Sequence, residues 1–368
     1  MTRNAVSMVL AIALTGLWAR ALAQGPGSQP AAVEPKAVAV LVAGLGGSKA
    51  YSRNILDWTN RFYKVLTTQC GLKAEHIVVL TEKADPRATP PRLQSTRENF
   101  RAAMKKVAAL LTPVDQFILF MVGHGQINEP VGKLCLPGRD LDSDELDRLL
   151  GALPTTRIVI INAASGGAEF LKSYIDPGRV IITAAGAGND GNQTYFAEFF
   201  IRGYETHRAD ANKDKVIDLF EAYAYAARET ANFYHRQYLV NPGGRVRVGE
   251  PLVWYVRGKE TRAIWRKLYA GTNNRLGLPR RNPGDPPLPD PDAEPDTEPK
   301  FGRFDVHWHN RRVLAEHARL DDNDTKKGFF LWQPYKFQKP PEDRPENVGY
   351  LARRTVLGRP EPLERPRK

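Results

Sequence analysis

Short, almost continuously apolar runs alternate along much of the chain with longer stretches in which apolar residues recur every three or four positions. The apolar runs predict buried strands at Ala37–Ala43, Ile77–Leu80, Phe117–Val122, Ile158–Ile161 and Arg179–Thr183. The periodic stretches predict helices at Ser52–Cys70, Thr96–Leu111, Ser143–Leu150, Phe196–Tyr204 and Leu219–Tyr238. Because buried strands alternate with helices, we expect an α/β fold with helices on both faces of a mostly parallel central sheet.

Two of the predicted strands end in glycine-rich turns. Gly123-His124-Gly125 follows the third strand, and Ala163-Ala164-Ser165-Gly166-Gly167 lies just beyond the fourth. Parallel strands place ligand sites outside their carboxyl ends. We therefore expect His124 and the turn around Ala163 to face one another across a shared cleft.

Five short motifs occur in a fixed order: Val42-Ala43-Gly44, Tyr51-Ser52-Arg53, Ile77-Val78-Val79-Leu80, Gly123-His124-Gly125 and Ser165-Gly166-Gly167. Together they resemble the legumain and caspase superfamily of cysteine peptidases over roughly Ala37 to Tyr238. The resemblance implies a three-layer caspase-like sandwich. It also implies that His124 holds the general-base position, that Gly125 supplies an oxyanion-binding N–H, and that Ala163 stands where the nucleophilic cysteine would be.

Ala163 changes what the resemblance implies about activity. Attack on a carbonyl needs a thiolate, and a methyl group has no lone pair and no proton to lose. We therefore predict a catalytically inactive peptidase homologue that binds a peptide or protein. One alternative is an active endopeptidase that cleaves after Asn or Asp, with Ser165 as an unusual nucleophile. Another is a calcium-dependent structural scaffold.

Arg53 falls where the resemblance implies an arginine that contacts the acidic or amide side chain of a substrate. A guanidinium group suits the bidentate capture of a carboxylate. The other interpretation is a solvated arginine near the start of a helix.

An acidic loop from Asp210 to Glu221 has the spacing of an EF-hand. With Asp210 at position 1, oxygen-bearing side chains fall at positions 1, 3, 5, 9 and 12, which are Asp210, Asn212, Asp214, Asp218 and Glu221. Val216 would give its carbonyl at position 7. Lys215 occupies position 6, where glycine is expected, and the left-handed backbone needed there costs about 1–2 kcal/mol. We therefore predict a weak Ca²⁺ site, or else an acidic helix N-terminus favoured by the helix dipole.

The ends of the chain differ in character from its centre. Residues 1–23 read as a signal peptide, with Arg3, an apolar run at Val6–Leu17 and a small-residue cleavage site at Ala21-Leu22-Ala23, so we expect a secreted or periplasmic protein with no stable membrane span. A linker (24–35) precedes the caspase-like domain (36–240). We interpret 241–300 as an insertion with a Pro/Asp-rich linker, 301–333 as a return to the core domain and 334–368 as a Pro/Arg-rich tail, disordered beyond Pro340.

The formal net charge is +12. Because no aromatic-basic repeat accompanies the lysines and arginines, we expect a solvated basic surface and no nucleic-acid partner. The chain has 2 cysteines, Cys70 and Cys135. In an oxidising compartment they could pair, and two buried free thiols are the other interpretation.

Overall fold

The computed structural model describes residues 34–128, 131–167, 174–185, 194–240, 316, 318–322, 332–333, 336–337 and 341–364. The backbone alone is described at 127–128, 231–240, 332–333 and 336–337. The predicted signal peptide and the predicted insertion at 241–300 lie outside these residues.

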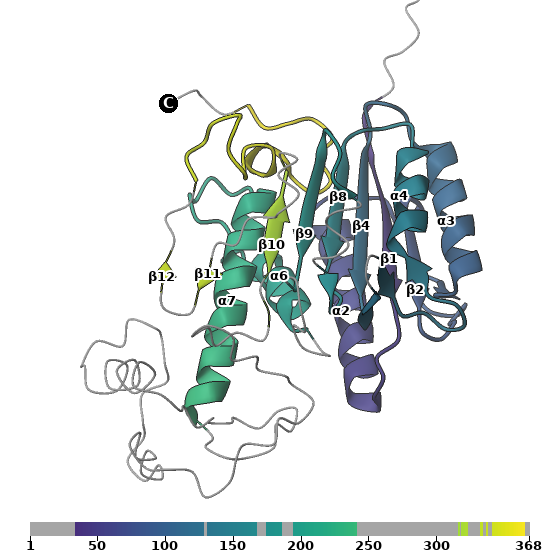
Figure 1. Ribbon diagram of the computed structural model, residues 1–368. Coiled ribbons are helices and arrows are strands. Elements are labelled where there is room, and N and C mark those ends of the chain that lie inside the picture. Colours follow the sequence, from purple (N-terminus) through teal and green to yellow (C-terminus); the bar gives the residue numbers. More distant parts are fainter. Residues whose placement is uncertain are drawn as a thin grey trace, which may run out of the picture. The chain divides into compact units, whose positions relative to one another are not determined.

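A seven-stranded sheet forms the centre, in the order β10-β9-β8-β4-β1-β2-β3 (Figure 1). Neighbouring strands are parallel except for β9 and β10, which are antiparallel. The strands are β1 (Ala37–Ala43), β2 (Ile77–Thr81), β3 (Arg92–Gln94), β4 (Gln116–Val122), β8 (Ile158–Asn162), β9 (Arg179–Thr183) and β10 (Arg319–Asp321). The predicted α/β fold with a mostly parallel sheet is confirmed.

Helices cover both faces of the sheet and make the fold three-layered. One face packs against α2 (Lys49–Thr68), α6 (Phe196–Glu205) and α7 (Leu219–Val240). The other packs against α3 (Arg97–Leu110) and α4 (Ser143–Gly151). The central strands β1, β4 and β8 are therefore buried along their whole length.

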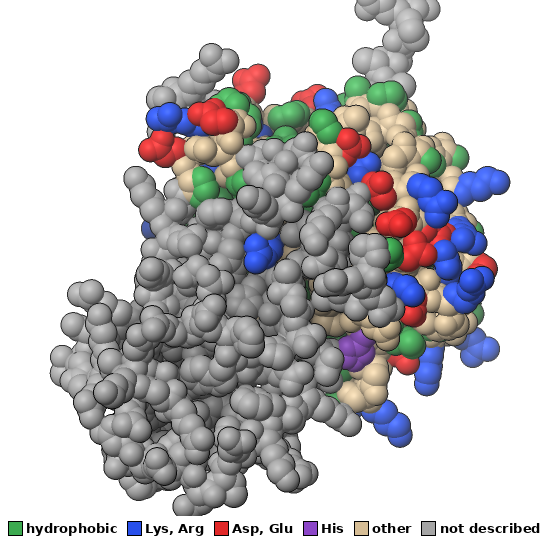
Figure 2. All heavy atoms as spheres, viewed as in Figure 1, with side chains coloured by type: hydrophobic (Ala, Val, Ile, Leu, Met, Phe, Trp, Pro, Cys, Tyr) green, Lys and Arg blue, Asp and Glu red, His purple; other side chains and the backbone are tan. Residues whose placement is uncertain are grey.

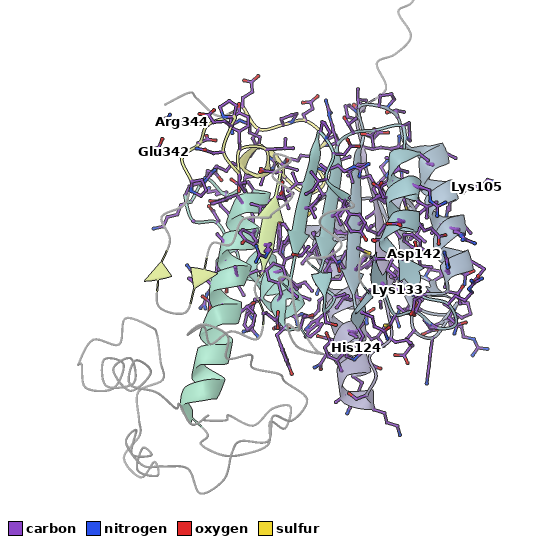
Figure 3. All side chains as sticks on the ribbon, in the orientation of Figure 1. Lys105, His124, Lys133, Asp142, Glu342 and Arg344 are labelled. Carbon is purple, nitrogen blue, oxygen red and sulfur yellow. The ribbon has the colours of Figure 1, made fainter. Side chains whose placement is uncertain are left out.

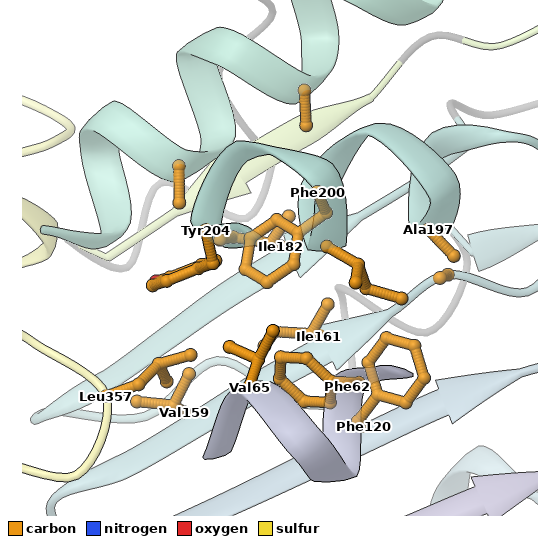
Figure 4. Packing of buried hydrophobic residues seen from close by; sticks show 14 of the residues in the cluster. Phe62, Val65, Phe120, Val159, Ile161, Ile182, Ala197, Phe200, Tyr204 and Leu357 are labelled. Atoms are coloured by element: carbon orange, nitrogen blue, oxygen red, sulfur yellow. The ribbon is translucent and has the colours of Figure 1, made fainter. Parts of the chain in front are cut away.

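Aromatic rings fill the layer between α2, the sheet and α6 (Figure 4). The ring of Phe62 on α2 lies 4.5 Å, between centroids, from Phe120 on β4 and 6.1 Å from Phe200 on α6. All three side chains are fully buried. Phe62 therefore joins α2 both to α6 and to the strand that leads to His124.

The order of the strands fixes where a ligand site is expected. From β1 the chain goes outward to β2 and β3, then crosses back to β4, β8 and β9 on the other side of β1. The direction of winding therefore reverses between β1 and β4. In such sheets the crevice outside the carboxyl ends at the point of reversal is the usual ligand site.

A small antiparallel sheet follows β4 and contains β5 (Gly125–Asn128), β6 (Val131–Leu134) and β7 (Leu141–Asp142). Cys135 comes directly after β6 and is buried.

Of the two interpretations of the cysteines, pairing or free thiols, the structure shows free thiols at both Cys70 and Cys135. The carbonyl of Cys135 lies near Gly44, beyond the carboxyl end of β1, whereas the carbonyl of Cys70 lies against Gly358 of the C-terminal segment. Burial raises the pKa of Cys70 to about 12 and that of Cys135 to about 11, so both thiols stay protonated near neutral pH.

The C-terminal segment, residues 341–364, is folded, and the expectation of disorder beyond Pro340 is wrong for these residues. It contains a short 3-10 helix, η2 (Ala352–Arg354), and it buries Ala352 and Leu357 in the core. Figure 1 shows it in yellow at the end of the sheet opposite to the carboxyl ends of the parallel strands. The abundance of Pro and Arg hid the few apolar residues that anchor the segment.

Residues 318–322 also belong to this core. Arg319–Asp321 forms the edge strand β10, and Leu320 is fully buried.

Lys and Arg side chains gather on the side of the molecule formed by α3, where Lys105 is labelled (Figures 2 and 3). Lys105 and Lys106 are exposed. Arg97 and Arg101 instead pair with the buried carboxylate of Glu145. Part of the positive charge on this side therefore ties α3 to α4, and the rest faces solvent.

Candidate functional site

The structure brings together the two turns that the sequence singled out. Strands β4 and β8 are neighbours, so both turns leave the same edge of the sheet. The N–H of Ser165 donates to the carbonyl of Gly123 at 3.3 Å, and the N–H of Ala163 donates to the carbonyl of Met121 at 2.7 Å. His124, Gly125, Ala163 and Ser165 therefore share one site beyond the carboxyl ends of the strands, where Figure 3 labels His124.

His124 is half-buried and points its ring at the loop after β1. Its Nε2 lies 2.9 Å from the carbonyl oxygen of Gly46, and its ring centroid lies 5.4 Å from that of Tyr51. A carbonyl oxygen only accepts, so Nε2 carries the proton in this bond. Nε2 therefore cannot take a proton from a nucleophile while the bond to Gly46 persists.

The hydroxyl of Ser165 is bonded to the backbone of Gly125. The N–H of Gly125 donates to Ser165 Oγ at 2.9 Å, and the hydroxyl donates to the carbonyl of Gly125 at 3.3 Å. The two residues therefore occupy each other's hydrogen-bonding groups. The expected oxyanion donor, the N–H of Gly125, and the alternative nucleophile, the hydroxyl of Ser165, are therefore both already hydrogen-bonded.

Ala163 is fully buried and is held at both of its backbone groups. Its carbonyl accepts from the hydroxyl of Thr194, and the N–H of Thr194 donates to the Tyr51 hydroxyl at 3.0 Å. Burial raises the pKa of Tyr51, so this phenol remains a neutral hydrogen-bonding group. These bonds connect the turn after β8 to α2 through side chains far apart in sequence.

Glu316 supports the same region from a distant part of the chain. Its carboxylate is buried and accepts the N–H of Phe196 at 2.9 Å and also the N–H of Tyr195. These groups lie at the start of α6, where unpaired N–H groups and the helix dipole favour a negative charge. Sequence reasoning assigned no role to Thr194 or Glu316, because no local pattern links either of them to the turn at Ala163.

Arg53 lies beside this site, on the other side of the loop after β1. Its side chain is exposed, and Arg53 Nε donates to the carbonyl of Lys49 at 3.3 Å. It lines a cavity of about 1010 Å³ that Gly47 also lines. Gly47 has a left-handed backbone, φ +65°, and a Cβ there would lie 2.8 Å from His124 Nε2. The Gly47 backbone therefore lies between the cavity and the His124 ring.

The first half of the acidic loop has the left-handed backbone that the EF-hand spacing predicts at Lys215. Lys213 and Lys215 are left-handed, with φ 63° and 68°. The amide of Lys215 donates to Asp210 Oδ2 at 3.0 Å, and the amide of Val216 donates to Asp214 Oδ1 at 2.8 Å. The side-chain oxygens therefore turn toward the loop's own backbone.

The loop ends in a capping box at the start of α7. The N–H of Glu221 donates to Asp218 Oδ1 at 2.8 Å, and the N–H of Asp218 donates to Glu221 Oε2 at 3.3 Å. Glu221 Oε1 also accepts from Ala211 and Asn212, and burial raises the pKa of Glu221. Within the described residues, no three His, Cys, Asp or Glu side chains are grouped so as to hold a metal ion.

Comparison with known proteins adds a remote likeness. No protein-family model matches the chain, and no curated protein matches it. Among solved structures it is similar to a crystal structure of the Drosophila initiator caspase Dronc, with 11% sequence identity and a TM-score of 0.34, over 52% of this chain and 71% of that one. A likeness at this level does not indicate which residues act.

The part of the chain that the structure describes contains no helix that is both long and apolar enough to cross a membrane.

Proposed function

We propose that the protein is a non-catalytic homologue of caspase- and legumain-like peptidases that binds a peptide or protein segment at the carboxyl edge of its sheet. The site lies where the winding of the sheet reverses, which is the ordinary ligand position in this kind of fold. The turn after β8 offers no thiolate, because Ala163 stands at the position that the resemblance assigns to the nucleophile.

One observation carries the proposal: the hydrogen-bonding groups that would serve catalysis are engaged within the protein. Stabilising an oxyanion needs donors aimed at the place where negative charge develops. The N–H of Gly125 donates instead to Ser165 Oγ, and the N–H of Ala163 donates to the carbonyl of Met121. His124 Nε2 faces the carbonyl of Gly46.

Peptide binding and peptide cleavage separate this proposal from the alternative of an active endopeptidase. The probes are fluorescent peptides that contain Asn or Asp, with binding followed by anisotropy and cleavage by mass spectrometry. We expect saturable binding and no cleavage by the wild-type protein, by His124→Ala and by the control His76→Ala. His76 lies in a 3-10 helix before β2, away from the turns.

Cleavage by wild type that is lost in His124→Ala and kept in His76→Ala would establish an active peptidase, with Ser165 as the nearest nucleophile and Arg53 as a reader of the substrate. If none of these peptides binds, the proposed binding role is overturned.

We also propose a weak Ca²⁺ role for the loop Asp210–Glu221, because Asp210 Oδ1 is buried and accepts no hydrogen bond within the described residues. The carboxylates of the loop are not grouped around a common point, so an ion would have to draw Glu221 away from the amides that it accepts. Thermal melting with and without calcium tests this role.

Export is proposed from the sequence of residues 1–23. A mature protein that begins at Gln24, determined by N-terminal sequencing of protein recovered outside the cytoplasm, is the expected result. A protein that retains Met1 would overturn export by a cleaved signal peptide.

A further inference from the structure

The cavity of about 1010 Å³ that Arg53 lines lies outside the site built from His124 and Ala163. We call it the α2–β2 cavity, because its walls include the N-cap Ser48 with the first turns of α2 (Lys49–Leu56) and the chain that follows β2 (Glu82–Asp85), with Arg92 of β3. Ala43, Leu45 and Gly47, at the end of β1 and in the loop after it, also line it. The volume is that of a typical small-molecule site.

The two carboxylates of the α2–β2 cavity already have partners. Glu82 Oε2 accepts the hydroxyl of Ser52 at 2.7 Å. Asp85 Oδ1 accepts the N–H of Arg87 at 3.2 Å, which closes the turn between β2 and β3. Asp85 also forms a long ion pair with Arg92, with 3.8 Å between Asp85 Oδ2 and Arg92 Nη1.

The four cations of the cavity are much less engaged than its carboxylates. Arg92 Nε is buried and has no hydrogen-bond partner within the described residues, although Arg92 is only half-buried as a whole. Arg53 donates only to a backbone carbonyl. Lys49 and Lys83 are exposed, and the described residues give neither of them an ion pair. A buried guanidinium N–H without an acceptor is costly, and a bound anion would supply the acceptor.

The rest of the cavity wall suits an apolar body. Ala43 and Ile55 are buried beneath it, and Leu45 and Leu56 are half-buried at its sides. The first turn of α2, which borders the cavity, contains no acidic residue, so the positive end of the helix dipole is not offset there. Apolar walls with a few convergent charges are typical of sites for small organic ligands.

We propose that the α2–β2 cavity binds a small organic anion in which carboxylate or phosphate groups are attached to an apolar body. Arg92 and Arg53 receive the anionic groups, Lys49 and Lys83 add to the positive field, and Ile55 and Leu56 contact the apolar part. The cavity adjoins the His124 turn, since Gly47 lines it and a Cβ on Gly47 would lie 2.8 Å from His124 Nε2. Arg53 is also the residue that the resemblance assigns to substrate contact.

Isothermal titration calorimetry on the full chain tests this site with four probes: adipate and phenyl phosphate as anions with an apolar part, inorganic phosphate as the bare anion, and hexylamine as a cation of similar size. We expect saturable binding of adipate or phenyl phosphate, weaker binding of inorganic phosphate and none of hexylamine. The better of the two organic anions identifies the anionic group.

Matched arginine variants separate a built site from general attraction to a basic protein. Arg53→Gln and Arg92→Gln should each raise the dissociation constant about tenfold, the usual effect of losing one charge-assisted hydrogen bond. Arg87→Gln is the matched control, because it removes one positive charge from the chain between β2 and β3. Arg87 is exposed and lies outside the cavity wall, so this variant should change the dissociation constant less than about twofold.

Unfolding would not explain a loss of binding in Arg53→Gln, because Arg53 is exposed and lies on the surface of a long helix. Equal losses in Arg53→Gln and Arg87→Gln, or no binding of any anion at millimolar concentration, would overturn the site. Peptide binding is measured with peptide probes and the His124→Ala variant, so a failure of this site and a failure of the proposed function are distinguishable.

Discussion

The backbone groups at the two ends of the central sheet find their hydrogen-bond partners in different ways. At the carboxyl end, the two motif turns bind one another, as in the reciprocal bonds between Gly125 and Ser165. At the amino end, a segment from the far end of the chain closes the fold: Gln116 at the start of β4 binds the backbone of Val356 and Gly358.

Different physical signals in the sequence mark the two ends. The carboxyl end depends on turns with small residues, which are visible as a local pattern. The amino end depends on a few polar side chains that each bind several backbone groups of a distant segment. Asp322, for example, accepts the N–H of Gly349 at 2.7 Å and of Ala352 at 2.8 Å.

The largest expected effect is that of Gln116→Leu at the amino end. Gln116 is buried; its Nε2 donates to the carbonyls of Val356 at 2.9 Å and Arg359 at 3.3 Å, and its Oε1 accepts from Gly358 at 2.9 Å. Leucine removes all three bonds, and the carbonyl of Val356 keeps only the N–H of Arg359 at 3.2 Å. We therefore expect the free energy of unfolding to fall by about 2–4 kcal/mol. Urea denaturation measures it.

A matched change on the exposed edge strand is the control for this variant. Gln94→Leu removes one long hydrogen bond of 3.4 Å from an exposed side chain and should cost less than about 0.5 kcal/mol. Trypsin should also cleave Gln116→Leu early at Arg353 and Arg354, as the C-terminal segment loosens. Equal stability losses in the two variants would show that Gln116 does not hold the segment.

The next effect concerns the carboxyl end and uses two glycines with similar backbones. Gly47 (φ +65°) and Gly71 (φ +72°) are both left-handed, but a Cβ at Gly47 would meet His124 Nε2, whereas nothing lies within 4 Å at Gly71. Alanine should cost about 1 kcal/mol at Gly71 from backbone strain alone and about 2 kcal/mol at Gly47.

A structural readout distinguishes the two glycine variants further. The imidazole ¹⁵N shifts of His124 should move in Gly47→Ala, because the added methyl displaces the ring from the Gly46 carbonyl, and should stay unchanged in Gly71→Ala. Unchanged His124 shifts in both variants would show that the ring does not depend on the space that Gly47 provides.

The sequence predicts one end of the sheet better than the other for a physical reason. Strands β1, β4 and β8 are recognisable in the sequence as continuous apolar runs, and their parallel pairing places His124 beside the turn at Ala163. The bonds from Thr194 to Ala163 and from Glu316 to α6 leave no local trace, because they join residues far apart in the chain. The same holds for Gln116 and the C-terminal segment, whose composition suggested disorder.

The third effect is a pH dependence at the amino end. Burial, followed by the neighbouring Asp321, raises the pKa of Asp322 above its usual value, although the amides of Ala352 and Gly349 act in the opposite direction. A raised pKa means that the folded state holds this proton more tightly than the unfolded state. The stabilisation is therefore fully present below the unfolded pKa and is lost as the pH rises through the folded pKa.

Asp322→Asn removes this titration. Relative to the variant, the wild-type free energy of unfolding should fall as the pH rises from about 4, the usual carboxyl range, through the folded pKa of Asp322. Urea denaturation at several pH values gives the difference. A difference that stays constant with pH would contradict the cited direction of the shift.

The smallest effect is that of calcium on the acidic loop, which adjoins the amino end through the bond between the N–H of Leu219 and the carbonyl of Thr355. A site half-saturated at 10 mM Ca²⁺ stabilises the fold by about 0.4 kcal/mol, so we expect the melting temperature to rise by about 1 °C.

The rise should vanish in Asp214→Ala and persist in Asp57→Ala, which removes an exposed carboxylate on α2. The strained backbone of Lys215 and the amides already bound to Glu221 keep the effect this small. Identical melting with and without calcium would leave the loop as a capping box alone, and an equal rise in all three proteins would assign the effect to general screening of charge.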